Sequence, residues 1–190
     1  MWPVFVGEVP WPRSRAGSYT LIPVPTTDIA MALQLASDWS ISRWFNADEG
    51  LTLASLRGRV VFLHAFQMLC PGCVQHAVPQ SLKVAAAFAG TDLAVIGLHT
   101  VFEHHPVMGP EALAVYLHEN RIAYPVGVDA YRDDDPARHP LPLTMQAYAM
   151  QGTPTLCLID RRGHLRRQLF GTIDDLRLGA EIATLLAEPA

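Results

Sequence analysis

Residues 60–79 read VVFLHAFQMLCPGCVQHAVP, an apolar run that leads into two cysteines separated by two residues. The run from Arg59 to Phe66 is rich in β-branched residues and has the length of a strand buried on both faces. From Gly72 to Phe88, apolar residues recur at helical spacing and form a stripe of Val74, Ala77, Val78, Leu82, Ala85 and Phe88. Cys70 and Cys73 are therefore predicted to lie at the junction between a buried strand and the amino terminus of a helix, the usual place for a site in an α/β protein. They are a redox pair, half of a metal site, or two buried thiols.

The spacing of the two cysteines suits thiol–disulfide exchange. A helix amino terminus carries unpaired backbone N–H groups and a partial positive charge, and both stabilise a thiolate at Cys70 over a thiol. Two intervening residues let Cys73 reach back, so that the first sulfur can attack a substrate disulfide and the second can resolve the mixed disulfide. Pro71 suits the first turn of a helix, and Gly72 lets a partner approach the backbone closely. A zinc site would have to recruit histidines from positions 99, 104 or 105.

The rest of the chain alternates between strand and helix patterns. A short hairpin, or a strand with a following turn, is predicted after Trp39. Further strands are predicted at residues 92–99, 124–128 and 155–160 and after a turn at residues 162–163, and further helices at residues 110–120, 143–150 and 174–186. Asp174 or Asp175 is predicted to cap the last helix. This alternation predicts an α/β fold, in which helices cover a sheet of parallel strands that ends in an antiparallel hairpin.

The first 37 residues differ from the rest in composition. They contain five prolines and predict only one short helix, which would end near Leu35. We therefore expect residues 1–37 to form a proline-rich N-terminal extension and residues 38–190 to form one domain.

Composition and charge narrow the function classes. Half of the residues are hydrophobic and 17% are charged, which is typical of a globular protein, and the net charge of −4 favours neither nucleic acid nor an anionic membrane as a partner. No segment approaches the roughly 20 apolar residues of a membrane-spanning helix, and the amino terminus lacks the pattern of a signal peptide. A cytoplasmic protein is the expectation, with export as the alternative. Arginines are predicted to decorate a solvated hairpin at positions 161, 162, 166 and 167.

Four segments together carry a resemblance to a known family: LRGRVVFLHAFQMLCPGC (56–73), VIGLHTVFEHHPVMGPEAL (95–113), YPVGVD (124–129) and GTPTLCLIDRRGHL (152–165). Over about residues 39–187 the chain resembles the thioredoxin fold, and more narrowly the TlpA-like and redoxin-domain thiol–disulfide oxidoreductases. The resemblance implies a thioredoxin-like three-layer fold, with a central mixed β-sheet flanked by helices, plus the N-terminal extension. It also implies a cis peptide bond between Thr153 and Pro154 that faces the cysteines and exposes the Thr153 backbone to a substrate strand.

The chain departs from the family pattern near the cysteines. Leu69 replaces the tryptophan that usually precedes the first cysteine, and the helix proline, Pro79, comes six rather than five residues after the second. His64 stands where relatives carry a buried aspartate or asparagine. It is a candidate for proton transfer with Cys73, or else a buried neutral histidine bonded to the backbone. Glu103 is a second candidate for proton transfer, because related proteins often carry an acid in this loop, or else a solvated carboxylate.

The resemblance implies an enzyme that exchanges a Cys70–Cys73 dithiol with the disulfides of proteins or small thiols, and with a redox partner protein, without a cofactor or a metal. A peroxidase of the peroxiredoxin type is one alternative, but Leu63 and Gln67 stand where such enzymes carry a proline and a hydroxyl residue. A metal-binding module on the same fold is another, although such relatives have three residues between the cysteines. Cys157 is predicted to be a small buried hydrophobe.

Overall fold

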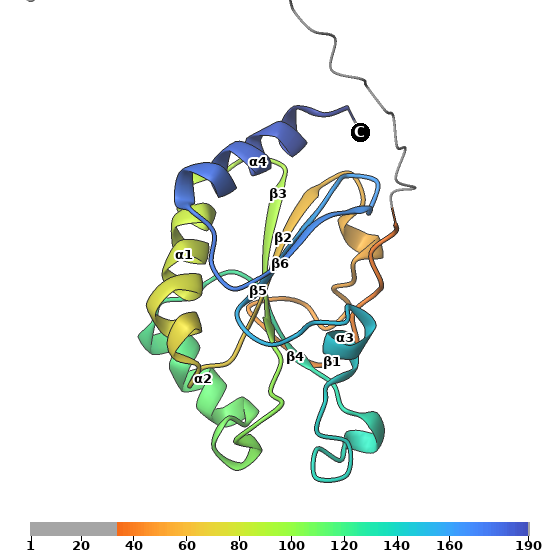
Figure 1. Ribbon diagram of the computed structural model, residues 1–190, viewed down its shortest axis with the longest axis vertical. Coiled ribbons are helices and arrows are strands. Elements are labelled where there is room, and N and C mark those ends of the chain that lie inside the picture. Colours follow the sequence, from red (N-terminus) through yellow and green to blue (C-terminus); the bar gives the residue numbers. More distant parts are fainter. Residues whose placement is uncertain (1–33, 190) are drawn as a thin grey trace, which may run out of the picture. The chain divides into compact units, whose positions relative to one another are not determined.

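The computed structural model describes residues 34–189, and Figure 1 shows their arrangement. The strands of this part of the chain are β1 (Ile41–Phe45), β2 (Val60–Phe66), β3 (Leu93–His99), β4 (Val126–Asp129), β5 (Thr155–Ile159) and β6 (Leu165–Phe170). Its α-helices are α1 (Val78–Ala87), α2 (Pro110–Glu119), α3 (Leu143–Ala147) and α4 (Asp175–Ala187). The predicted extension of residues 1–37 lies almost entirely outside the described residues, so that division stays a prediction.

The six strands form one mixed sheet in the order β1-β4-β3-β2-β5-β6. Strands β2, β3 and β4 run parallel to one another, while β1, β5 and β6 each pair antiparallel with their neighbours. The predicted parallel sheet with an antiparallel terminal hairpin is thereby confirmed. Strand β2 is central and all seven of its residues are buried, which places the turn that follows it at the middle of one sheet edge.

Helices cover both faces of the sheet, which gives the three layers that the family resemblance implies. Helices α1, α2 and α4 lie on one side and α3 on the other (Figure 1). The α1 side is packed with residues from alternate positions of the strands and from the three helices, among them Phe62, Phe66, Val84, Leu113 and Ile182. The α3 side has a separate core that includes Trp44, Leu63, Met145, Tyr148 and Cys157.

The helix after the cysteines begins with a π-helical turn. Residues Cys73–Ala77 form this turn, in which the Val78 N–H donates to the Cys73 carbonyl five residues back, and α1 continues from there. A π-turn holds one residue more than an α-turn, so it accommodates the extra residue between Cys73 and Pro79. The predicted helix is confirmed, but its apolar stripe is wrong at Val74. The wider turn places Cys73 rather than Val74 on the face of Val78, and Val74 is 40% exposed.

The segment that precedes β1 runs beside the β5–β6 hairpin. The Ala36 N–H donates to the Gly163 carbonyl and the Leu165 N–H to the Gln34 carbonyl, each over 2.9 Å. Leu35 forms an isolated antiparallel bridge with His164, so the residue expected to end a short helix is extended instead. The remainder of that predicted helix lies outside the described residues.

Candidate functional site

Cys70 lies in the turn that follows β2, directly before the helical turns. Its backbone N–H donates to the Gln67 carbonyl over 3.2 Å, and its carbonyl accepts from the Val74 N–H over 3.0 Å. The Cys73 backbone N–H points back at the Cys70 sulfur, 3.3 Å away. Both cysteines are free thiols, with Cys70 partly exposed and Cys73 fully buried. Cys70 is therefore partly accessible at the predicted strand-to-helix position, and its sulfur receives a backbone donor.

Cys73 has a very different environment from Cys70. Burial, together with a hydrogen bond to Cys70, raises the pKa of the Cys73 thiol to about 12. The Gln67 backbone and the Thr153 side chain act in the opposite direction, because their hydrogen bonds favour the thiolate. The Cys73 thiol is thus buried and protonated, while Gln67 and Thr153 partly offset the effect of burial on its pKa.

The loop before β5 forms the wall opposite the cysteines. The Thr153–Pro154 peptide bond is cis, as the family resemblance implies. The Cys70 thiol donates to the Thr153 carbonyl over 3.5 Å, which joins the nucleophile position to this loop. Gly72 faces the same loop closely, because a Cβ atom at that position would lie 3.3 Å from the Pro154 Cδ. Three of the four residues predicted to bind substrate thereby meet beside Cys70, while Pro71 is exposed at the start of the helical segment.

Gln67 is a site residue that the sequence did not predict; it was noted only because it stands where peroxiredoxins carry a hydroxyl residue. Its side chain is 1% exposed, and its Nε2 donates to the Thr153 Oγ1 over 3.3 Å and to the Glu103 Oε1 over 3.5 Å. The candidate proton-transfer residue Glu103 is therefore linked to the cysteine loop through Gln67. A polar residue directly after a buried strand, three positions before Cys70, was the available signal.

His64 lies in the middle of β2, on the α1 side of the sheet. Its ring stacks on Phe62 and Phe66, with centroid distances of 6.1 and 5.2 Å, and meets the edge of Tyr124. The side chain is 1% exposed, and neither ring nitrogen has a hydrogen-bond partner among the described residues. Burial lowers the pKa of His64 to about 3, which opposes proton acceptance near neutral pH. The alternative of a buried neutral histidine thus fits the burial but not the expected backbone bond, and proton transfer by His64 stays a prediction.

Tyr116 on α2 is a further polar group near the cysteines. Its ring stacks on Phe66 at a centroid distance of 6.2 Å, and its hydroxyl is buried with no partner among the described residues. Burial raises the pKa of Tyr116, and negative charge at Cys73 and Cys70 raises it further. No feature of the sequence around residue 116 predicted this buried hydroxyl.

The residues that a metal site would have recruited lie apart. Among residues 34–189, no group of three or more histidine, cysteine or acidic side chains is placed to hold a metal ion. Cys157 is fully buried in the α3-side core, as expected of a small hydrophobe. His105 lies in the loop after β3, where its Nε2 contacts the Pro140 carbonyl at 3.3 Å.

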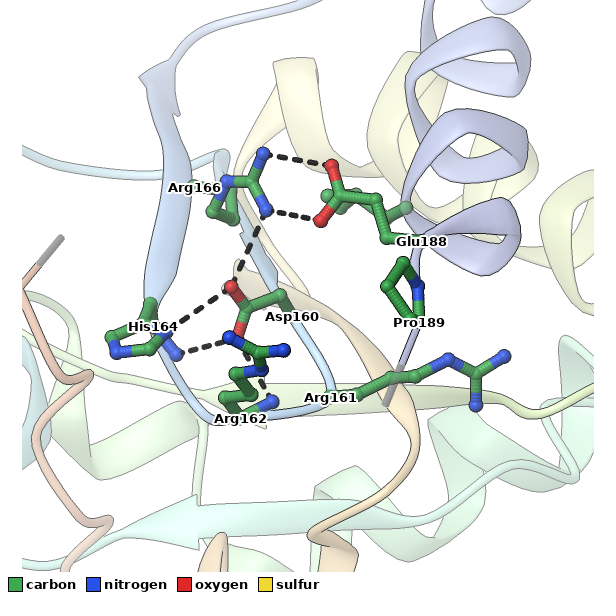
Figure 2. Close-up of a pocket in the computed structure, with 8 residues that line it drawn as sticks. Asp160, Arg161, Arg162, His164, Arg166, Glu188 and Pro189 are labelled. Atoms are coloured by element: carbon green, nitrogen blue, oxygen red, sulfur yellow. Dashed lines mark hydrogen bonds and ion pairs between the residues drawn. The ribbon is translucent and has the colours of Figure 1, made fainter. Parts of the chain in front are cut away.

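A pocket of about 260 Å³ lies at the other end of β5 from the cysteines, around the hairpin tip (Figure 2). Asp160 accepts hydrogen bonds there from His164 and Arg166, and Arg166 also pairs with Glu188 at the end of α4. Although burial acts to raise it, these donors hold the pKa of Asp160 below its usual value. The four arginines lie on the β5–β6 hairpin as predicted, with Arg162 and Arg166 exposed. The prediction did not include their ion pairs with α4 and neighbouring turns, which are Arg161–Asp92, Arg166–Asp160, Arg166–Glu188 and Arg167–Glu181.

A mixed sheet, a Cys-x-x-Cys pair at the start of a helix and a facing cis-proline define a thiol–disulfide oxidoreductase of the thioredoxin fold. Two solved structures agree with this class. A thioredoxin-like superfamily protein is 54% identical, with a TM-score of 0.77, and the match covers 83% of this chain and 99% of that one. A thiol-disulfide isomerase from Corynebacterium glutamicum is 44% identical, with a TM-score of 0.75, over 83% of this chain and 98% of that one. The chain belongs to the thioredoxin-like superfamily, among its thiol–disulfide oxidoreductases.

Curated sequences give a more distant match. The protein DipZ of Mycobacterium tuberculosis, like that of Mycobacterium bovis, is 30% identical over 136 residues, which cover 70% of this chain. The chain spans only 18% of the length of these relatives. No protein-family model matches it. Within residues 34–189, none of the helices is long and apolar enough to cross a membrane, and the cytoplasmic location stays a prediction.

Proposed function

We propose that the chain catalyses dithiol–disulfide exchange with Cys70 as the nucleophile and Cys73 as the resolving thiol. The observation that carries this proposal is the 3.3 Å contact between the Cys73 N–H and the Cys70 sulfur. The N–H points at the sulfur that attacks, and the difference in burial lets a substrate disulfide reach Cys70 rather than Cys73. A helix start that presents its first donor to a partly exposed sulfur is what thiolate attack requires.

The proposed reaction has two balanced steps. The Cys70 thiolate attacks one sulfur of a substrate disulfide, which forms a mixed disulfide and releases the other substrate sulfur as a thiolate that takes up a proton. Cys73 then loses its proton and attacks the Cys70 sulfur, so that the Cys70–Cys73 bond forms and the substrate leaves as a thiol. Two electrons pass from the protein to the substrate. A redox partner protein would restore the dithiol by the reverse exchange.

The surface around Cys70 suits protein substrates. Leu69 is 55% exposed beside Cys70, and Phe170 is 52% exposed where its ring lies against Gly152, next to Thr153. Exposed apolar side chains on both sides of Cys70 and the cis-proline loop favour a polypeptide over a small charged thiol. The C. glutamicum relative, a thiol-disulfide isomerase, is consistent with such substrates.

Reduction of insulin, followed by turbidity with dithiothreitol as the reductant, tests this function. Cys70→Ser should abolish the protein's acceleration of insulin reduction by dithiothreitol. Cys73→Ser should leave a mixed disulfide between Cys70 and the substrate that is visible on a non-reducing gel. Cys157→Ser is the matched control, because Cys157 is buried in the other core and should not affect the reaction. Full activity in Cys70→Ser, or no trapped complex in Cys73→Ser, would contradict the assigned roles.

A further inference from the structure

Gln67 joins three parts of the site that are far apart in the sequence. Its side-chain amide reaches the loop after β3 at Glu103 and the cis-proline loop at Thr153, and its backbone carbonyl accepts from the Cys70 N–H. The Gln67 backbone also acts to lower the pKa of the Cys73 thiol. A buried glutamine is costly unless its amide is used, so this side chain needs an explanation within the site.

The amide of Gln67 determines where the Thr153 hydroxyl can point. Because Gln67 Nε2 donates to the Thr153 Oγ1, it occupies an oxygen lone pair and leaves the hydroxyl hydrogen for another acceptor. Thr153 lies beside the cysteine pair, because its carbonyl accepts from the Cys70 thiol over 3.5 Å, and its side chain acts to lower the pKa of the Cys73 thiol. The contact of the other Nε2 hydrogen with Glu103 fixes which end of the amide faces Thr153, because a carboxylate accepts only from the NH₂ group.

We propose that Gln67 is a positioning residue of the second exchange step, whose side-chain amide orients the Thr153 hydroxyl toward the Cys73 sulfur. This inference rests on the proposed role of Cys73 as the resolving thiol. In that step Cys73 gives up its proton, the Cys73–Cys70 bond forms, and the Cys70–substrate bond breaks as the departing substrate sulfur takes up a proton. The oriented hydroxyl stabilises the Cys73 thiolate that attacks, and Gln67 touches neither the substrate nor the reacting sulfurs with its side chain.

Reaction of the reduced protein with 5,5′-dithiobis(2-nitrobenzoate) separates the two steps in one stopped-flow trace. The first coloured thiolate is released when Cys70 attacks the reagent, and the second when Cys73 resolves the mixed disulfide. Gln67→Leu keeps the approximate volume and removes the amide. Its second phase should be about tenfold slower at pH 7, the value for losing roughly one pKa unit of thiolate stabilisation, and the pH profile of that phase should move upward by the same unit. The first phase should stay close to that of the unmodified protein.

Gln75→Leu is the matched control, because Gln75 is an exposed glutamine on the same helical turn as Cys73 and should leave both phases unchanged. Thr153→Val should slow the second phase to a similar extent. The double variant of Gln67→Leu and Thr153→Val should be no slower than the slower single variant, because Gln67 acts only through that hydroxyl.

Two results would overturn the proposal: a second phase at the unmodified rate in Gln67→Leu, or additive effects in the double variant, which would indicate a general packing role. If Gln67→Leu also lost its first phase through misfolding, Thr153→Val would decide, and an unmodified second phase there would overturn the proposal. Failure of the underlying function looks different, because the unmodified protein would then release only one equivalent of coloured thiolate.

Discussion

Replacing His64 with leucine should make the protein less sensitive to acid. In the folded protein, burial lowers the pKa of His64 to about 3, whereas in the unfolded chain the imidazole takes up a proton near its ordinary value of 6.5. A group whose pKa is depressed by folding contributes stability that is present above pH 6.5 and is lost as the pH falls toward the folded value. At pH 5 the unfolded imidazole is almost fully charged while the folded one stays neutral. Lowering the pH from 7 to 5 therefore reduces the free energy of unfolding by about 2 kcal/mol through His64.

The assay is urea unfolding at pH 7 and pH 5, followed by the fluorescence of the four tryptophans. Between these two pH values, His64→Leu should lose about 2 kcal/mol less stability than the unmodified protein does. At pH 7 it should be at least as stable, because leucine removes two buried ring nitrogens that lack partners. The exposed His76 provides the control variant His76→Leu. An identical pH dependence with and without His64 would refute the reasoning and would indicate a histidine that titrates near neutrality in the folded state, as proton transfer to Cys73 would need.

Three further predictions test other parts of the structure. The second, Cys73-dependent phase of disulfide exchange should accelerate about tenfold per pH unit from pH 6 to pH 8.5, because burial raises the pKa of Cys73 above this range. A rate that levels off within this range in stopped-flow traces would contradict a buried Cys73 thiol. Gly97→Ala should destabilise the protein by about 1–3 kcal/mol in urea unfolding, because its Cβ would lie 2.9 Å from the Val126 Cγ2, whereas Gly50→Ala meets nothing within 4 Å and should cost little. Asp174→Ala should lose about 1 kcal/mol of unfolding free energy, because the carboxylate caps α4 through the N–H groups of the next turn, and Asp174→Asn should retain most of it; equal losses would argue against the cap.

Much of the fold could be predicted because its signals are local. The buried strand before Cys70, the helix after it and the hairpin turn at Gly163 follow from residue periodicity and turn composition within short windows, and each is present. The placement of Thr153 opposite Cys70 came from the family resemblance, since nothing local joins two residues 83 positions apart. Asp174 as the cap of α4 is likewise confirmed, because capping depends on one residue and the turn that follows it.

The unpredicted features all depend on contacts across the sheet. The environment of His64 is decided by Gly97 on the neighbouring strand, which leaves room for the imidazole where a side chain would collide with Val126. The role of Gln67 requires Glu103 and Thr153 to approach it from two other loops, 36 and 86 positions away. The role of a glutamine three residues before a cysteine cannot be predicted until the fold shows which residues lie next to its side chain.

The π-helical turn after Cys73 changes the residue spacing that a sequence motif for this site must accept. The wide turn holds one residue more than an α-turn, which offsets the shift of Pro79 from five to six residues after Cys73 relative to the family pattern. A search motif that counts a fixed number of residues from the second cysteine to the proline would reject this chain. A motif that requires the additional residue at positions 74–78 would collect candidates for the same helix start, apart from chains with the shorter spacing.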